Sequence, residues 1–227
     1  MTHGHPRITF SGKYFKSVQY QMAEGFEGDR SGDYFDFDAI RKLALKSKPK
    51  ILVVGTTAFP RILDWKKFAE IADEVGAYLL ADISHIAGLV AGGVHPSPVP
   101  YAQLVTTTTH KTLRGPRGAI IMVTQKGIEK DPDLPQKIDK AVFPGLQGGP
   151  HLHTIAGIAI ALEKARQPEF KVYANQTVKN AKVLAEELTA GGFDLVTGGT
   201  DNHLMVVDLR KVETEGKAAA VELEKSG

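Results

Sequence analysis

The chain has 227 residues, of which 42% are hydrophobic and 24% are charged, a balance typical of a globular protein with a sizeable core. Its 28 Lys and Arg against 26 Asp and Glu give a net charge of +2, which argues against a nucleic-acid binder with a basic face. The absence of cysteine excludes disulfides and thiolate catalysis. No apolar run is long enough for a membrane span or a signal peptide, so we expect a cytoplasmic protein.

The opening residues 1–36 show little periodicity, and we expect an irregular segment there. Beyond them, apolar residues at helical spacing predict helices, and short apolar runs predict strands. In chain order, the predicted elements are a helix over 36–46, a strand over 51–55, a helix over 64–75, strands over 77–81, 104–109 and 119–123, helices over 133–142, 151–165 and 168–189, strands over 193–196 and 204–208, and a helix over 216–225.

Strands that alternate with helices predict an α/β fold, with a mainly parallel mixed sheet flanked by helices. The runs Ile51–Gly55 and Ala77–Ala81 are continuously apolar, as in parallel strands buried on both faces. Only a short turn separates residues 104–109 from residues 119–123. These two strands are therefore expected to be antiparallel neighbours.

Polar and reactive side chains follow three of the predicted strands. Thr57 follows the first, Asp82 and His85 follow the second, and His110 and Lys111 follow the third. Ligands of parallel sheets bind beyond the carboxyl ends of the strands, where such residues converge. The sequence therefore predicts a site at this edge of the sheet.

Lys111 is the first candidate for chemistry at this edge. A lysine at the end of a buried strand loses solvent, which lowers its pKa and makes the amine nucleophilic. Asp82 has two interpretations, either a cap for the turn at Ser84 and His85 or a partner for a protonated pyridine nitrogen. Asp82 and His85 have the spacing of a metal pair, but further ligands at standard spacings are missing, so we expect no metal.

A glycine-rich loop precedes the helix predicted at residue 151. Its glycines are Gly145, Gly148 and Gly149. Backbone N–H groups at such a junction can hold a phosphate, but tight turns also require glycine for steric reasons. Both interpretations are open on spacing alone.

Several segments together resemble the serine hydroxymethyltransferase family, in the family's order and over essentially all 227 residues. The lysine segment is the most specific, and its string disfavours other pyridoxal-phosphate enzymes such as threonine aldolases and racemases. The matching segments are Thr2–Gly4 (THG), Phe10–Lys13 (FSGK), Ala81–Gly93 (ADISHIAGLVAGG), Val105–Gly118 (VTTTTHKTLRGPRG), Ala141–Pro150 (AVFPGLQGGP) and Gly198–Leu204 (GGTDNHL).

The resemblance implies that Lys111 binds pyridoxal 5'-phosphate as the internal aldimine. It implies that Asp82 pairs with the pyridine nitrogen, and that His85 and Thr57 lie near the phenolic oxygen and the substrate carboxylate. Lys111, His85 and Asp82 are thus the expected catalytic residues. Thr57 departs from the family pattern, which often has Ser at this position, but it keeps the hydroxyl.

The resemblance also assigns residues around the aldimine and the phosphate. Thr108 and His110 would shape the pocket around the aldimine. Gly148 and Gly149 would donate backbone N–H groups to the phosphate bound by a partner subunit. The expected assembly is therefore a homodimer with shared sites.

The implied reaction is the reversible conversion of serine and tetrahydrofolate into glycine and 5,10-methylenetetrahydrofolate. The implied fold is the large domain of fold-type I pyridoxal-phosphate enzymes. We assign residues 1–210 to a truncated form of this domain, and residues 211–227 to the start of a C-terminal domain that is cut off. Family residues that stack on the cofactor and clamp the substrate carboxylate have no match, so we expect reduced or no turnover. The alternative is a non-catalytic dimerising fragment that keeps the fold.

Overall fold

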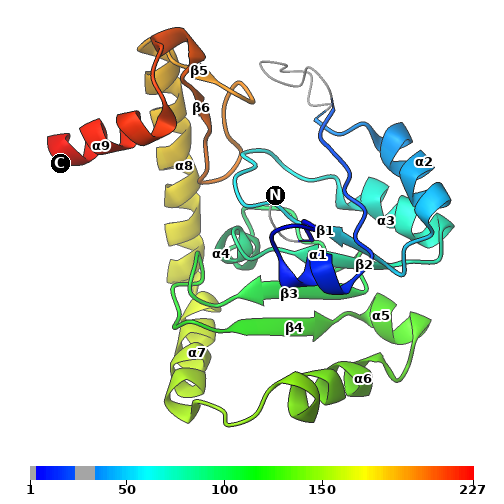
Figure 1. Cartoon of the computed structure of the whole chain (residues 1–227). Helices are drawn as coiled ribbons and strands as arrows, with labels where there is room; N and C mark the ends of the chain where they lie inside the picture. The colour runs from blue at the N-terminus through cyan, green and yellow to red at the C-terminus, as the bar shows by residue number, and fades with distance from the viewer. Residues whose placement is uncertain (1–3, 24–33) are drawn as a thin grey trace.

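The computed structural model describes residues 4–23 and 34–227. Its main sheet contains β1 (Ile51–Val54), β2 (Tyr78–Asp82), β3 (Leu104–Thr108) and β4 (Ala119–Val123). The strands lie in the order β1-β2-β3-β4 (Figure 1). β1, β2 and β3 are parallel, and β4 pairs antiparallel with β3. This confirms the predicted α/β fold with a mainly parallel mixed sheet.

Helices precede, join and follow these strands, and a small second sheet lies near the C-terminus. None of the helices in the described ranges has both the length and the hydropathy that a membrane span requires. The elements are α1 (Phe10–Tyr14), α2 (Phe37–Ser47), α3 (Trp65–Glu74), α4 (Ala87–Ala91), α5 (Gln125–Lys130), α6 (Leu134–Lys140), a kinked turn (Ala141–Leu146), α7 (Leu152–Ala165), α8 (Pro168–Ala190), the antiparallel strands β5 (Asp194–Leu195) and β6 (Val207–Asp208), a 3₁₀ turn (Arg210–Val212) and α9 (Gly216–Ser226).

Two aspartates fix the starts of the helices on either side of β1. The side chain of Asp36 accepts a hydrogen bond from the N–H of Ala39 at 2.8 Å. Asp64 accepts one from the N–H of Lys67 at 3.0 Å. Such caps satisfy backbone donors that the first turn of a helix leaves unpaired. The predicted starts of α2 and α3 are therefore confirmed to within one residue.

The hydrophobic core lies between the sheet and the helices that pack against it. Phe68 of α3, Leu79 of β2 and Val105 of β3 each have an exposed fraction of 0%. Phe68 also packs edge-on against Phe35 and Phe37. Burial of a large apolar side chain contributes roughly 1.5–3 kcal/mol, so this contact region is what fixes α3 on the sheet.

The strand predicted over 204–208 forms only over Val207–Asp208, and the structure differs from the sequence prediction in two further respects. The helices α1, α4 and α5 have only five or six residues each, and they were not predicted because periodicity needs a longer window. The side chains of β1 alternate, with Leu52 and Val54 buried, whereas Ile51 is 48% and Val53 is 53% exposed. The prediction that β1 is buried on both faces was therefore wrong for the described part of the chain.

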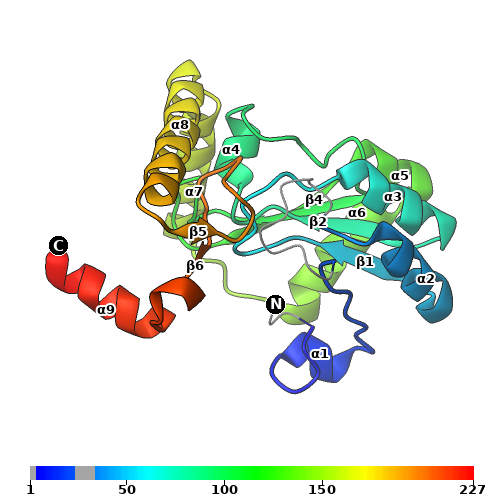
Figure 2. The same cartoon turned by 90° about the horizontal axis from the view of Figure 1, so that it is seen from above.

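The helices α7 and α8 stand at one end of the sheet, and α2, α3 and α5 lie toward the other end (Figure 2). β3 points toward α7 and α8 in Figure 1, so these helices lie on the side of its carboxyl end. The short helix α4, which follows β2, packs against α8. The carboxyl edge of the sheet is thus bordered by α4 and α8.

Candidate active site

Lys111 and His85 meet at the carboxyl edge of the sheet. Lys111 lies three residues beyond β3, and His85 lies three residues beyond β2. The Nζ atom of Lys111 lies 3.0 Å from Nε2 of His85. Since β2 and β3 are parallel neighbours, the segments that leave their carboxyl ends emerge side by side. The predicted convergence of these two residues is confirmed, while their chemical roles stay predictions.

Asp82 is the last residue of β2, and both of its carboxylate oxygens are hydrogen-bonded. Oδ1 accepts a bond from the N–H of Ser84 at 2.9 Å, and Oδ2 accepts one from the hydroxyl of Thr106 at 3.0 Å. The first bond is the turn cap that one interpretation of the sequence predicted. Each oxygen keeps a further lone pair, so the cap leaves Asp82 able to accept another donor.

Hydrogen bonds tie the chain segments beyond β2 and β3 to each other. The N–H of Thr108 donates to the hydroxyl of Ser84 at 3.0 Å, and the hydroxyl of Thr108 donates to the Ser84 carbonyl at 3.4 Å. The hydroxyl of Thr112 accepts from the N–H of Gly88 at 2.8 Å and donates to the carbonyl of His85 at 3.4 Å. The turn that carries His85 and the loop that carries Lys111 are therefore positioned against each other before any ligand binds.

The electrostatic environment favours a neutral imidazole at His85. Burial lowers the pKa of His85, the positive charge of Lys111 lowers it further, and Asp82 opposes the shift. A neutral ring can accept a hydrogen bond at Nε2 from the Lys111 ammonium group. Beside Lys111, the Nδ1 atom of His110 is buried and has no hydrogen-bond partner in the described part of the chain.

His203 also lies in this environment, although the sequence analysis gave it no role. Burial lowers the pKa of His203, and electrostatic repulsion between the protonated forms of His203 and His85 lowers it further. The loop before it is anchored beyond β1, where the side-chain amide of Asn202 donates to the carbonyl of Phe59 at 3.0 Å. The polar run Asp201–His203 between the predicted strands 193–196 and 204–208 was the available signal.

Three predicted site residues are not brought into contact with Lys111. The side chain of Thr57 is exposed, and no hydrogen bond joins it to another described residue. Gly148 and Gly149 are exposed, and a Cβ atom at either position would have no described heavy atom within 4 Å. In the matching segment Thr2–Gly4, residues 2 and 3 lie outside the described residues.

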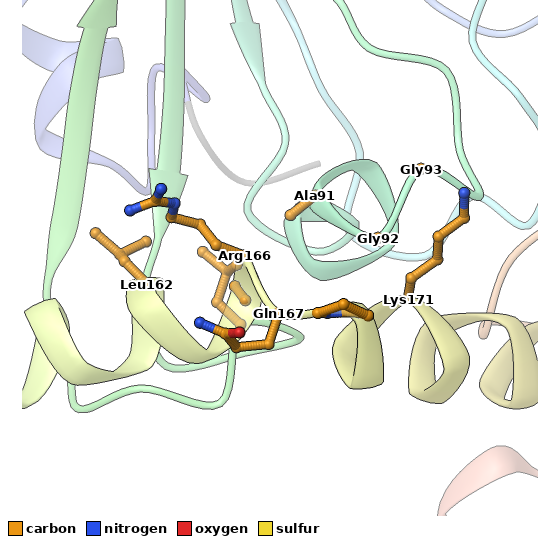
Figure 3. A pocket seen from close by; sticks show the side chains of 10 residues that line it. Ala91, Gly92, Gly93, Leu162, Arg166, Gln167 and Lys171 are labelled. Carbon is orange, nitrogen blue, oxygen red and sulfur yellow. The ribbon is translucent and has the colours of Figure 1, made fainter.

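A surface hollow of about 680 Å³ opens between α4 and the junction of α7 and α8 (Figure 3). Figure 3 shows the side chain of Lys171 rising from α8 beside the Gly92–Gly93 end of α4. Leu113, in the loop that carries Lys111 (residues 109–118, the lysine loop), also lines the hollow. Within residues 4–23 and 34–227, no group of three or more side chains is arranged to hold a metal ion.

Comparison with known proteins agrees with this geometry. Residues 1–227 match the profile of the family described as serine hydroxymethyltransferase, whose members are fold-type I enzymes that use pyridoxal phosphate. The serine hydroxymethyltransferase of Rhizobium rhizogenes is 54% identical over 223 residues, which cover 98% of this chain and 49% of that protein. The one from Bartonella henselae is also 54% identical over 223 residues, covering 98% and 48%. The chain thus spans about half the length of these curated relatives, and over that span it belongs to the serine hydroxymethyltransferase family.

Proposed function

We propose that this chain carries the lysine and ring-binding part of a pyridoxal-phosphate site. We further propose that it serves the reversible conversion of serine and tetrahydrofolate into glycine and 5,10-methylenetetrahydrofolate. The observation that carries the proposal is the 3.0 Å contact between Lys111 Nζ and His85 Nε2, at the same edge of the sheet as Asp82. Because the chain spans about half the length of its relatives, the proposal assigns it only part of the site.

The residues at this edge fit the cofactor. Lys111 offers an amine that would hold it covalently, and Asp82 offers a carboxylate that would hold the ring nitrogen. The buried Nδ1 atom of His110 has no partner among the described residues and is available to a polar group of a ligand. When bound, pyridoxal phosphate supplies an electron sink for charge at the α-carbon of an amino acid.

His85 is placed to accept a hydrogen bond from the amine of Lys111. The amine must be neutral to act as a nucleophile, so its proton needs an acceptor. The Nε2 atom of His85 lies at hydrogen-bond distance from Lys111 Nζ, and the lowered pKa of His85 keeps that nitrogen available at neutral pH. The unprotonated Nε2 atom can therefore accept a hydrogen bond from Nζ without movement of either chain segment.

Asp82 and Thr108 supply orientation. The two donors on Asp82 fix its carboxylate plane, and the bonds between Thr108 and Ser84 fix the end of β3. Such prior positioning reduces the reorganisation that a reaction would otherwise require. The exposed hydroxyl of Thr57 is proposed to face the substrate carboxylate or the phenolic oxygen of the cofactor.

The proposal includes a homodimer in which the glycine loop serves the phosphate site of the partner. Gly148 and Gly149 are exposed, and the loop is flanked by Leu146 at 89% exposure and Leu152 at 71% exposure. Large apolar side chains that are exposed on both sides of a loop favour association with another molecule. We also propose that residues 211–227 begin a second domain, because α9 contains no buried residue.

The dimer is tested by measuring the mass of the chain in solution with and without pyridoxal phosphate. The expected value is twice the chain mass of 24.6 kDa. A chain that binds the cofactor and remains a monomer would contradict the shared site.

The lysine assignment is tested by adding pyridoxal phosphate and recording the visible absorption band of the lysine-bound cofactor. We expect Lys111→Ala to abolish the band, since it removes the amine that lies 3.0 Å from His85. The matched control is Lys126→Ala, a lysine paired with Asp73 in a separate part of the chain. A band that persists unchanged in Lys111→Ala would rule out this site.

Turnover separates the two functional alternatives. Glycine formation from serine and tetrahydrofolate would support a catalytic chain. Lysine-dependent cofactor binding without glycine formation would support the non-catalytic dimerising fragment. Robust turnover by the 227-residue chain would overturn the expectation of reduced activity.

A further inference from the structure

The loop that carries Lys111 folds into a tight turn closed by Arg114. The N–H of Arg114 donates to the carbonyl of Lys111 at 2.9 Å. The next N–H, that of Gly115, donates to the carbonyl of Thr109 at 2.8 Å. The backbone position of Arg114 is therefore directly coupled to the backbone position of Lys111.

Arg114 has an unusual backbone conformation for a residue with a side chain. Its φ of 60° lies in the left-handed region, which is uncommon for residues other than glycine and costs free energy for a long side chain such as arginine. The surrounding structure must therefore compensate for this conformation. The contacts of the arginine side chain are the candidate for that compensation.

The guanidinium group of Arg114 stacks on two aromatic rings of α8. Its central carbon lies 4.0 Å from the ring centroid of Tyr173 and 5.2 Å from that of Phe170. A guanidinium over an aromatic face within this range makes a favourable cation–π contact. No carboxylate in the described ranges forms an ion pair with Arg114, so the rings are its principal partners there.

The rings of Phe170 and Tyr173 pack against each other, and the ring of Phe170 is buried. Phe170 is 3% exposed, and its ring centroid lies 5.7 Å from that of Tyr173. Both residues lie in the first turns of α8, a helix of 23 residues. The arginine therefore attaches the lysine loop to a long, packed element and not to another loop.

The loop that carries Lys111 has a different neighbour on each side of Arg114. Leu113, the neighbour of Arg114, lines the hollow of about 680 Å³, and it is only 6% exposed because it belongs to the hydrophobic core. On the other side, the hydroxyl of Thr112 is bonded to the N–H of Gly88 at the start of α4. A hydrogen bond thus fixes the loop to α4, and the side chain of Arg114 connects the loop to α8.

We propose that Arg114 is a positioning residue that clamps the lysine loop to α8 and thereby keeps Lys111 Nζ beside His85. The clamp does not touch the site itself and acts only through the turn that joins Arg114 to Lys111. The inference rests on the proposed function only for what Lys111 binds, since the mechanical coupling concerns the chain alone.

The first measurement is hydrogen–deuterium exchange of the cofactor-free chain. Arg114→Gln removes the cation, and we expect exchange in residues 109–118 to rise about fivefold to tenfold because the bonded amides open more often. Exchange in β2, residues 78–82, should stay unchanged, which separates local loosening from global unfolding. Arg166→Gln is the matched control, an exposed arginine paired with Glu163 and near the same helix junction.

The second measurement uses pyridoxal phosphate. Arg114→Gln should shift the pH midpoint of the visible band of the lysine-bound cofactor, because the loop no longer keeps Lys111 beside His85. Arg114→Lys retains a cation over the rings and should partly restore both readouts. A purely structural role would leave the pH midpoint unchanged.

A third variant tests the contact with the two rings from the side of α8. Tyr173→Leu removes the nearer ring at a position that is 41% exposed, so the helix should keep its fold. Its effect on the loop should match that of Arg114→Gln, and the double variant should add little more. Additive effects, or unchanged exchange in residues 109–118, would overturn the clamp. If the wild-type chain forms no visible band, the proposed function fails while the exchange measurement still decides the clamp.

Discussion

The lysine loop, residues 109–118, and the glycine loop, residues 147–150, both lie in segments that resemble the same family, but they are held very differently. The lysine loop is closed by internal hydrogen bonds, tied to α4 through Thr112 and stacked on α8 through Arg114. The glycine loop is exposed throughout, and the adjacent Leu146 is 89% exposed.

This difference teaches that a strong motif does not reveal whether its site is assembled within one chain. The contacts around Lys111 preorganise the lysine and the carboxylate of Asp82 without help from another molecule. The glycine loop has the backbone donors that a phosphate requires, and the N–H groups of Gly148 and Gly149 donate to no other described backbone carbonyl. The comparison is consistent with a site shared between subunits, as proposed above.

The largest effect on stability is expected from adding a methyl group on the side of the lysine loop, at Gly88. A Cβ atom at Gly88 would lie 2.3 Å from the carbonyl oxygen of Thr112, so the lysine loop or α4 must shift. We expect Gly88→Ala to lower the free energy of unfolding by roughly 1–3 kcal/mol. Urea titration monitored by circular dichroism measures this change.

Gly148→Ala is the matched substitution in the glycine loop. A Cβ atom there meets no described atom within 4 Å, so we expect a change within about 0.5 kcal/mol. Equal destabilisation by Gly88→Ala and Gly148→Ala would show that the two loops are packed alike and would break the comparison.

A smaller effect on stability is expected from pH, through His85, His95 and His203. Burial lowers the pKa values of His85, His95 and His203 below the ordinary value of 6.5. The unfolded chain then binds protons at these rings more tightly than the folded chain. Stability should therefore be retained above pH 6.5 and fall as the pH decreases below it.

Thermal unfolding between pH 8 and pH 5 checks this direction. The midpoint should decrease on acidification before the carboxylates titrate. A midpoint that rises over this range would mean that the imidazoles are stabilised in their charged form. The replacement His95→Gln should flatten the slope, because it removes one of the three groups from the balance.

Most of the helices and strands that position the site were predictable from local pattern. The helices α2 and α3 have aspartate caps and apolar residues at helical spacing, and the antiparallel pairing of β3 and β4 follows from the short turn between them. The five-residue helices α1 and α4 were not predictable, because one turn of helix leaves too few residues for a period. The exposed face of β1 was also missed, since an apolar run does not reveal what covers it.

The candidate site was predictable in part. The convergence of Asp82, His85 and Lys111 followed from the order of parallel strands, and it is observed. His203 was not assigned, because its neighbourhood depends on a loop that returns to the carbonyl of Phe59 from far along the chain. The catalytic and cofactor-binding roles of all these residues stay predictions until the experiments above are made.

By itself, the sequence determined the fold class, the family, and which strands end in reactive side chains, since these depend on local pattern and on motif. Only the tertiary structure decided that Lys111 lies at hydrogen-bond distance from His85, that Thr106 donates to Asp82, and that Arg114 lies over the rings of α8. These contacts join residues that are often more than 20 positions apart, and their geometry depends on how the sheet and α8 are packed. The local sequence pattern does not specify the distance between such residues. The contact of Arg114 with α8 could therefore be found only in the folded structure.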